Sequence, residues 1–138
     1  MPHTAAFLAL LHSKNNRNVW GAMSAIDTIA DARAKDVALN LKEILAAADK
    51  GSVIAKDKAI STLSKLALAG DAKAMPALLE RLDTAAPNQF PMYAELALPV
   101  VGKHRAKFQA ILETRLQSME HAAKRARVEK VQRKLGKG

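Results

Sequence analysis

The chain has 138 residues, of which 49% are hydrophobic and only 4% aromatic, with a formal net charge of +9 and no cysteine. The lack of cysteine excludes disulfides and thiolate metal sites, and the longest apolar runs are too short to span a membrane. The length suggests a single domain over residues 1–138, and the abundance of Ala and Leu favours helices over strands.

The spacing of apolar residues predicts a chain built of helices alone. A short helix at about 4–13 comes first, and a last helix covers about 120–135. Between them we expect three helical pairs, at 18–32 with 35–49, 55–69 with 72–85, and 90–101 with 104–118. No stretch is typical of a strand with a partner, so the expected fold class is all-α.

Turn-forming residues punctuate this pattern. Gly51 and Gly70 follow predicted helix ends, where a left-handed residue is commonly needed. Asp57 and Asp71 are candidate helix N-caps, because short polar side chains accept hydrogen bonds from free N–H groups. Pro99 falls late in its helix and is expected to kink it.

The helical pairs share an apolar pattern that repeats after 37 and then 34 residues. In the first helix of each pair the matching residues are Ala22, Ile26, Ile29 and Ala30, then Ala59, Leu63, Leu66 and Ala67, then Tyr93, Ala97, Val100 and Val101. In the second helix they are Leu41 and Leu45, Leu78 and Leu82, and Leu112 and Leu116. A shift of 34 back from Leu41 and Leu45 reaches Phe7 and Leu11, which predicts a half-repeat ahead of the first pair.

Residues 18–29 have a polar start at Asn18, then Val19, the small pair Gly21 and Ala22, and a late Ile29. This segment resembles the first helix of a HEAT repeat, of the HEAT-like (armadillo-type) helical repeat family. Residues 57–66 match its later half, and the resemblance covers about 18–118.

The resemblance implies a right-handed α-α superhelix (an α-solenoid) of about three HEAT-like hairpins. An extra N-terminal helix would precede these repeats, and a basic C-terminal helix over 120–138 would follow them. Stacked hairpins bury faces that one hairpin cannot bury alone, and such proteins mostly bind other macromolecules. We therefore expect a non-catalytic scaffold that binds a protein partner, through the surface of 35–49, 72–85 and 104–118.

No pattern of residues indicates catalysis or a bound cofactor. The histidines lack metal-ligand spacing, there is no phosphate-binding glycine loop, and the serines lack a nucleophile-elbow context. Asp27 and Asp31 are four residues apart, which favours a solvated helix face. We expect no enzyme activity, no cofactor and no metal. The histidines are His3, His12, His104 and His121.

The positive charge is concentrated in the last quarter of the chain. Residues 1–102 hold 11 Lys/Arg against 10 Asp/Glu, whereas residues 103–138 hold 11 against 3. This basic end predicts either a solubilising cap on the last repeat, a nucleic-acid surface or a site for an acidic protein. No aromatic residue lies among the cations, which disfavours base stacking. The candidate binding residues are Lys103, Arg105, Lys107, Lys124, Arg125, Arg127, Lys130, Arg133 and Lys134.

The expected partner is therefore a protein, with nucleic acid at the basic C-terminal end as the alternative. The two ends of a short solenoid also make self-association a hypothesis. In the last helix Val128, Val131 and Leu135 form only a thin apolar stripe, which disfavours a membrane surface. The first residues show no basic segment ahead of an apolar one, so we expect a cytoplasmic protein.

Overall fold

The structure is a computed structural model that describes Ala9 and residues 16–137, without the side chains of 16–18, Trp20 and Lys137. All secondary structure in this part of the chain is helical, which confirms the predicted all-α class. The chain forms two compact units, Met1–Ala74 (unit 1) and Met75–Gly138 (unit 2). Of the predicted first helix at 4–13, only Ala9 is described, and it is helical.

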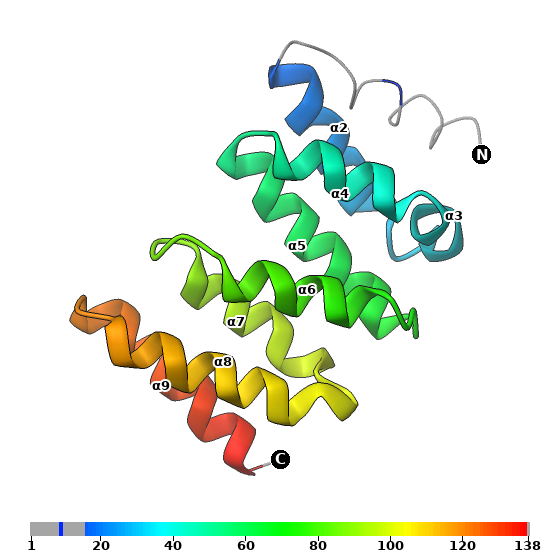
Figure 1. The fold of residues 1–138 in the computed structure, drawn as a ribbon. Helices are drawn as coiled ribbons and strands as arrows, with labels where there is room; N and C mark the ends of the chain where they lie inside the picture. Colours follow the sequence, from blue (N-terminus) through cyan, green and yellow to red (C-terminus); the bar gives the residue numbers. More distant parts are fainter. Residues whose placement is uncertain (1–8, 10–15, 138) are drawn as a thin grey trace. The chain divides into compact units, whose positions relative to one another are not determined.

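Unit 1 contains helices α2 (Asn16–Ile29), α3 (Ala34–Leu39), α4 (Leu41–Asp49) and α5 (Val53–Leu68). Helix α5 packs lengthwise on α2 and also contacts α4 and α3. Figure 1 shows α5 below α2 and α4, in the green part of the chain. Helix α5 thus packs against both α2 and α4.

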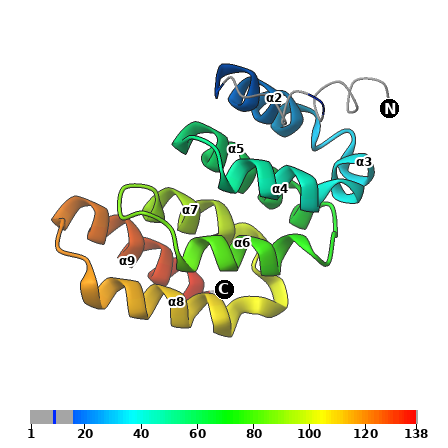
Figure 2. The same cartoon turned by 45° about the horizontal axis from the view of Figure 1, so that its top comes forward.

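The predicted single helix at 35–49 is two helices, α3 and α4, which Figure 2 shows as separate elements. The break lies at Asn40, whose Nδ2 donates to the main-chain carbonyl of Asp36 at 2.9 Å. The backbone of Asn40 departs from α-helical geometry, with φ −109° and ψ 15°. Asparagine favours such breaks because its side chain competes for main-chain hydrogen bonds.

The two predicted aspartate N-caps are wrong. Ser52 caps α5 instead, since its Oγ accepts from the Ala55 N–H at 3.4 Å and its backbone is extended. Asp57 lies inside α5. Helix α6 begins at Ala74, too late for Asp71 to be its cap, and the main-chain carbonyl of Asp71 accepts from the Ala74 N–H at 3.4 Å.

The two predicted glycine caps differ. Gly70 has φ +96°, and the N–H groups of Gly70 and Asp71 donate to the carbonyls of Ala67 and Leu66, which closes α5 in the expected left-handed motif. Gly51 has no positive φ, so that prediction is wrong. A Cβ at Gly51 would lie 3.0 Å from the Ala55 Cβ, so close approach explains the glycine there.

Unit 2 contains most of α6 and all of the later helices. Pro99 ends a helix instead of kinking it, because the chain passes from α7 into a 3-10 turn at this proline. Gly102, with φ +48°, begins a second such turn that leads into α8. The bounds are α6 (Ala74–Asp83), α7 (Phe90–Ala97), η1 (Leu98–Val100), η2 (Gly102–His104), α8 (Arg105–Ser118) and α9 (Ala122–Lys137).

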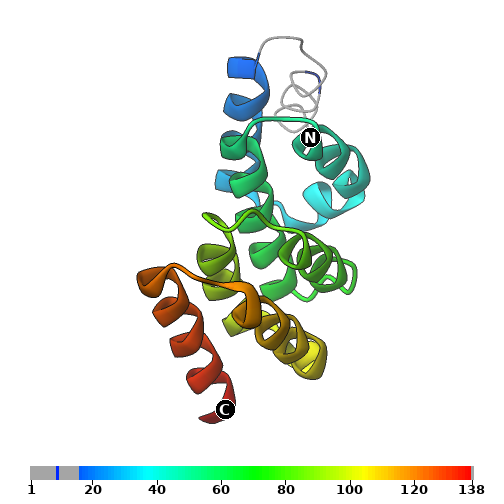
Figure 3. The same cartoon turned by 60° about the vertical axis from the view of Figure 1, so that its left-hand side comes forward.

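Helix α9 packs on both α7 and α8. Figure 3 shows α9, in red, alongside α8. This repeats the arrangement of unit 1, where α5 packs on α2 and α4. Within each unit, the two helices of a pair therefore pack against the helix that begins the next part of the chain: α5 in unit 1 and α9 in unit 2.

The core follows the predicted repeat register. Of the eighteen repeating apolar positions in the three helical pairs, all are buried except Ile29, Ala67 and Val100, which are half-buried; Phe7 and Leu11 lie outside the described residues. These positions line the inner sides of the helices because residues three and four apart share one helix face. The register of the packing could thus be predicted, although some helix ends could not.

Candidate basic surface

Helix α9 continues the repeat beyond the three pairs that the sequence pattern predicted. Val128 and Val131 lie 34 residues after Ala94 and Ala97 and 68 after Ile60 and Leu63. All six side chains are at most 3% exposed. Leu135 completes the buried stripe of α9. Of the four positions that repeat in the predicted first helices, α9 keeps apolar residues at two, Val131 and Leu135, while Arg127 and Lys134 occupy the other two.

Three of the nine candidate cations are engaged within unit 2. Lys124 donates to Asn88 in the loop before α7. Arg125 donates to the main-chain carbonyls of Leu116 and Met119 and so caps the end of α8. Its Nε lies 4.0 Å from Glu129 Oε1. These contacts hold the start of α9 against the preceding helices.

The third engaged cation is Arg127, which pairs with Glu95 of α7. Its Nη2 lies 2.5 Å from Oε1 and its Nε lies 3.2 Å from Oε2, so the pair is bidentate. The hydrogen bond to Glu95 raises the pKa of Arg127 above its ordinary value, against a smaller effect of burial. Both side chains are nearly half exposed, and exposed pairs of this kind contribute at most about 1 kcal/mol.

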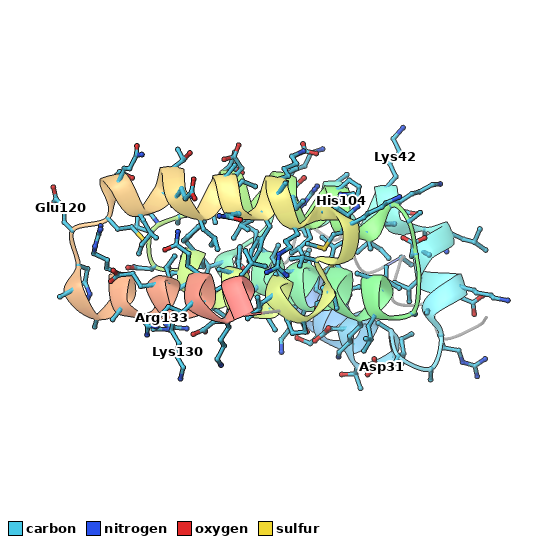
Figure 4. All side chains as sticks on the ribbon, turned by 90° about the horizontal axis from the view of Figure 1, so that it is seen from below. Asp31, Lys42, His104, Glu120, Lys130 and Arg133 are labelled. Carbon is cyan, nitrogen blue, oxygen red and sulfur yellow. The ribbon has the colours of Figure 1, made fainter. Side chains whose placement is uncertain are left out.

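The side chains of the other six candidates make no hydrogen bond or ion pair with the residues that the structure describes. Five are exposed and Arg105 is half-buried. Figure 4 shows Lys130 and Arg133 projecting outward from α9. The six form two groups, one at the start of α8 and one on the outer face of α9. They are Lys103, Arg105 and Lys107, and Lys130, Arg133 and Lys134.

A further cation, Arg115 of α8, was missed by the sequence analysis. Its Nη1 donates to the carbonyls of Leu82 and Asp83 at 3.3 and 3.2 Å, and its Nη2 to that of Ala85 at 2.7 Å. The guanidinium also lies 4.2 Å from the centre of the Phe90 ring. Arg115 therefore caps α6 and connects it to α7 and α8.

Burial lowers the pKa of Arg115, and the nearby carboxylate of Asp83 opposes this effect. The one sequence signal for Arg115 is that it lies 34 residues after Arg81. Arg81 is half-buried and donates to the Ala77 carbonyl at 3.1 Å. Charge counting alone cannot separate such structural arginines from solvent-facing ones.

A shallow hollow of about 260 Å³ lies at the turn between α8 and α9. Two of its cations, Arg115 and Lys124, are directed at acceptors of the protein itself. The Nδ1 of His121 accepts from the Lys124 N–H at 3.3 Å and so caps α9. The hollow is shaped by these caps, and its lining residues are Pro87, Arg115, Ser118, Met119, Glu120, His121 and Lys124.

The prediction that Asp27 and Asp31 both face solvent is right for Asp31 and wrong for Asp27. Asp31 is exposed, as Figure 4 shows, but Asp27 is only 7% exposed. Lys65 Nζ lies 3.2 Å from Asp27 Oδ1 and donates to its carbonyl at 2.7 Å. The Thr62 hydroxyl lies 3.4 Å from the same Oδ1 and 2.8 Å from the Lys58 carbonyl. Asp27 thus joins α2 to α5, a contact between segments distant in sequence.

Residues 16–137 contain no group of three His or carboxylate side chains able to hold a metal ion. His104 stands just before α8 and His121 just before α9, while His3 and His12 lie outside the described residues. In the same part of the chain, no helix has the length and apolar character to cross a membrane.

Comparison with known proteins yielded no matching family model, no matching curated protein and no matching solved structure.

Proposed function

We propose that the chain is a non-catalytic helical-repeat scaffold that binds a protein partner. The resemblance of residues 18–118 to HEAT repeats supports this proposal. The packing of α5 on α2 and α4, and the matching packing of α9 on α7 and α8, also support it. We propose further that the hairpins belong to one α-solenoid and that the protein is cytoplasmic.

Large apolar side chains left exposed in unit 1 are the observation that carries the protein-binding proposal. Leu39 at the end of α3 is 83% exposed, and Leu68 at the end of α5 is 75% exposed. Val53 and Ile54 at the start of α5 are about half exposed. Burying one such side chain at an interface stabilises a complex by about 1.5–3 kcal/mol. Val53 and Ile54 lie about 21 Å along the helix axis from Leu68, since an α-helix rises about 1.5 Å per residue, so the apolar contacts are offered at both ends of α5.

The test replaces both leucines by a polar side chain of similar size, in the variant Leu39→Gln/Leu68→Gln. Tagged wild type and variant are used to capture proteins from lysate, and each captured protein is quantified by mass spectrometry. The variant should retain at most about a tenth of the specific partner, because it loses two apolar contacts. The matched control Ala46→Gln/Ala72→Gln introduces the same side chain at two other exposed positions of unit 1.

The folded state should be preserved in both variants, because exposed substitutions usually change stability by about 0.5 kcal/mol or less. Retention of the same partner at the same level by the leucine variant would contradict the proposal. Equal loss in the control variant would also contradict it, because the effect would then not belong to the leucines.

A further inference from the structure

One stripe of four helical positions is buried in α5 but exposed and largely basic in α9. In α5 the positions 55, 59, 62 and 66 are Ala, Ala, Thr and Leu, and all are at most 2% exposed. The positions 68 residues later in α9 are Ala123, Arg127, Lys130 and Lys134, and all are exposed. The repeat therefore keeps its register in α9 while a buried stripe becomes a solvent-facing basic stripe.

A cap needs a polar outer face, but not one of a single sign. Helix α9 holds seven Lys/Arg and only one carboxylate, Glu129, which lies beside Arg125. Lys130 and Lys134 are four residues apart, a spacing at which like charges destabilise a helix. The basic stripe thus carries a repulsion that a mixed-charge cap would avoid.

The favourable effect of the helix dipole does not explain the whole cluster. Cations are stabilised at a helix C-terminus, but this effect falls off within the last turn. Lys134 lies in the last turn of α9, whereas Lys130 and Arg133 lie before it. Arg127 is neutralised by Glu95, so the unneutralised part of the face is Lys130, Arg133 and Lys134.

The composition of this face favours one class of partner. Protein interfaces have an apolar core enriched in aromatic residues and Met. Between Lys130 and Lys134 the only large apolar side chain is the buried Val131. Among the described residues, the large apolar side chains classed as exposed all lie in unit 1. Interfaces with nucleic acid are more polar and far more positive than protein interfaces.

We propose that the outer face of α9, formed by Lys130, Arg133 and Lys134, binds the phosphate backbone of duplex nucleic acid without reading its sequence. The three cations span about 6 Å along the helix axis, since an α-helix rises about 1.5 Å per residue. One strand of a duplex carries a negative charge about every 3.4 Å of axis, so two or three phosphates can be neutralised together. This site uses none of the residues on which the protein-binding proposal depends, so either proposal can fail alone.

The test measures binding of the full chain to a fluorescein-labelled 20-bp DNA duplex by anisotropy, over a series of salt concentrations. The variant Lys130→Gln/Arg133→Gln/Lys134→Gln removes three charges from the face. Its affinity at low salt should fall by about tenfold or more, and the slope of log K against log salt should become shallower by about 2.7. The control Lys42→Gln/Lys50→Gln/Lys56→Gln removes the same charge from exposed positions of unit 1 and should bind nearly as wild type does.

Thermal melts followed by circular dichroism establish that both variants are folded. Lys130→Arg/Lys134→Arg keeps the charge and should keep the affinity. The proposal is overturned if the α9 variant and its control weaken equally, or if the wild type fails to bind the duplex at low salt. It is also overturned if two duplexes of unrelated sequence bind with different affinity. Competition by polyglutamate as strong as that by DNA of equal charge would overturn it too, in favour of an acidic protein partner.

Discussion

In both units one helix packs against two earlier helices, but the residues along one stripe of that helix differ between the units. In unit 1, α5 packs on α2 and α4 and buries the stripe of Ala55, Ala59, Thr62 and Leu66. In unit 2, α9 packs on α7 and α8 but buries mainly Val128, Val131 and Leu135. The same helical register thus carries a buried stripe in α5 and a solvent-facing basic stripe in α9.

The ion pairs that join neighbouring first helices differ in the same sense. The pair of Asp27 and Lys65 between α2 and α5 has side chains that are 10% and 28% exposed. The pair of Glu95 and Arg127 between α7 and α9 has side chains that are 43% and 47% exposed. Water screens the second pair far more than the first, so only the first should matter for folding.

The largest expected effect compares the same repeat position in the two helices. Leu63 of α5 is fully buried, and Val131 of α9 is 3% exposed. Leu63→Ala should lower the free energy of unfolding by about 3 kcal/mol, from lost transfer energy and a cavity. Val131→Ala removes less volume from a narrower interface and should lose about half as much.

Urea denaturation followed by circular dichroism gives both values. The exposed substitution Thr114→Ala in α8 serves as the control and should change stability little. An equal or greater loss for Val131→Ala would show that α9 is as deeply packed as α5, against the account given above.

A smaller effect separates the two ion pairs. Asp27→Asn keeps the shape of the side chain but removes its charge beside Lys65, and should lower the free energy of unfolding by about 1–2 kcal/mol. Glu95→Gln should change it by about 0.5 kcal/mol or less. Double-mutant cycles with Lys65→Met and Arg127→Gln isolate the two pair energies. Pair energies in the opposite order would break the comparison.

The sequence predicted those features of the fold that depend on local periodicity. Buried positions such as Ile26 and Leu112 follow from apolar spacing, and Gly70 follows from its place after a helix. The break at Asn40 and the space limit at Gly51 depend on how side chains meet neighbouring backbone. Spacing along the chain does not encode these contacts.

The candidate site was predicted only as a list of cations. Charge counting grouped Arg125 and Arg127 with Lys130, although the first two are engaged with α8 and α7. It also missed Arg115 and took Asp27 for a solvated residue. Arg115, Arg125, Arg127 and Asp27 each contact residues of another helix or its end, so their roles became visible only in the structure.

The central claim is that unit 1 offers apolar contacts to a protein while unit 2 offers cations to phosphate. The most direct test measures the protein captured by the tagged full chain after exhaustive nuclease digestion of the lysate. We predict that the specific protein partner is recovered in undiminished amount. Loss of that protein on nuclease digestion would contradict the claim, because the protein would then be held through nucleic acid and not by the chain itself.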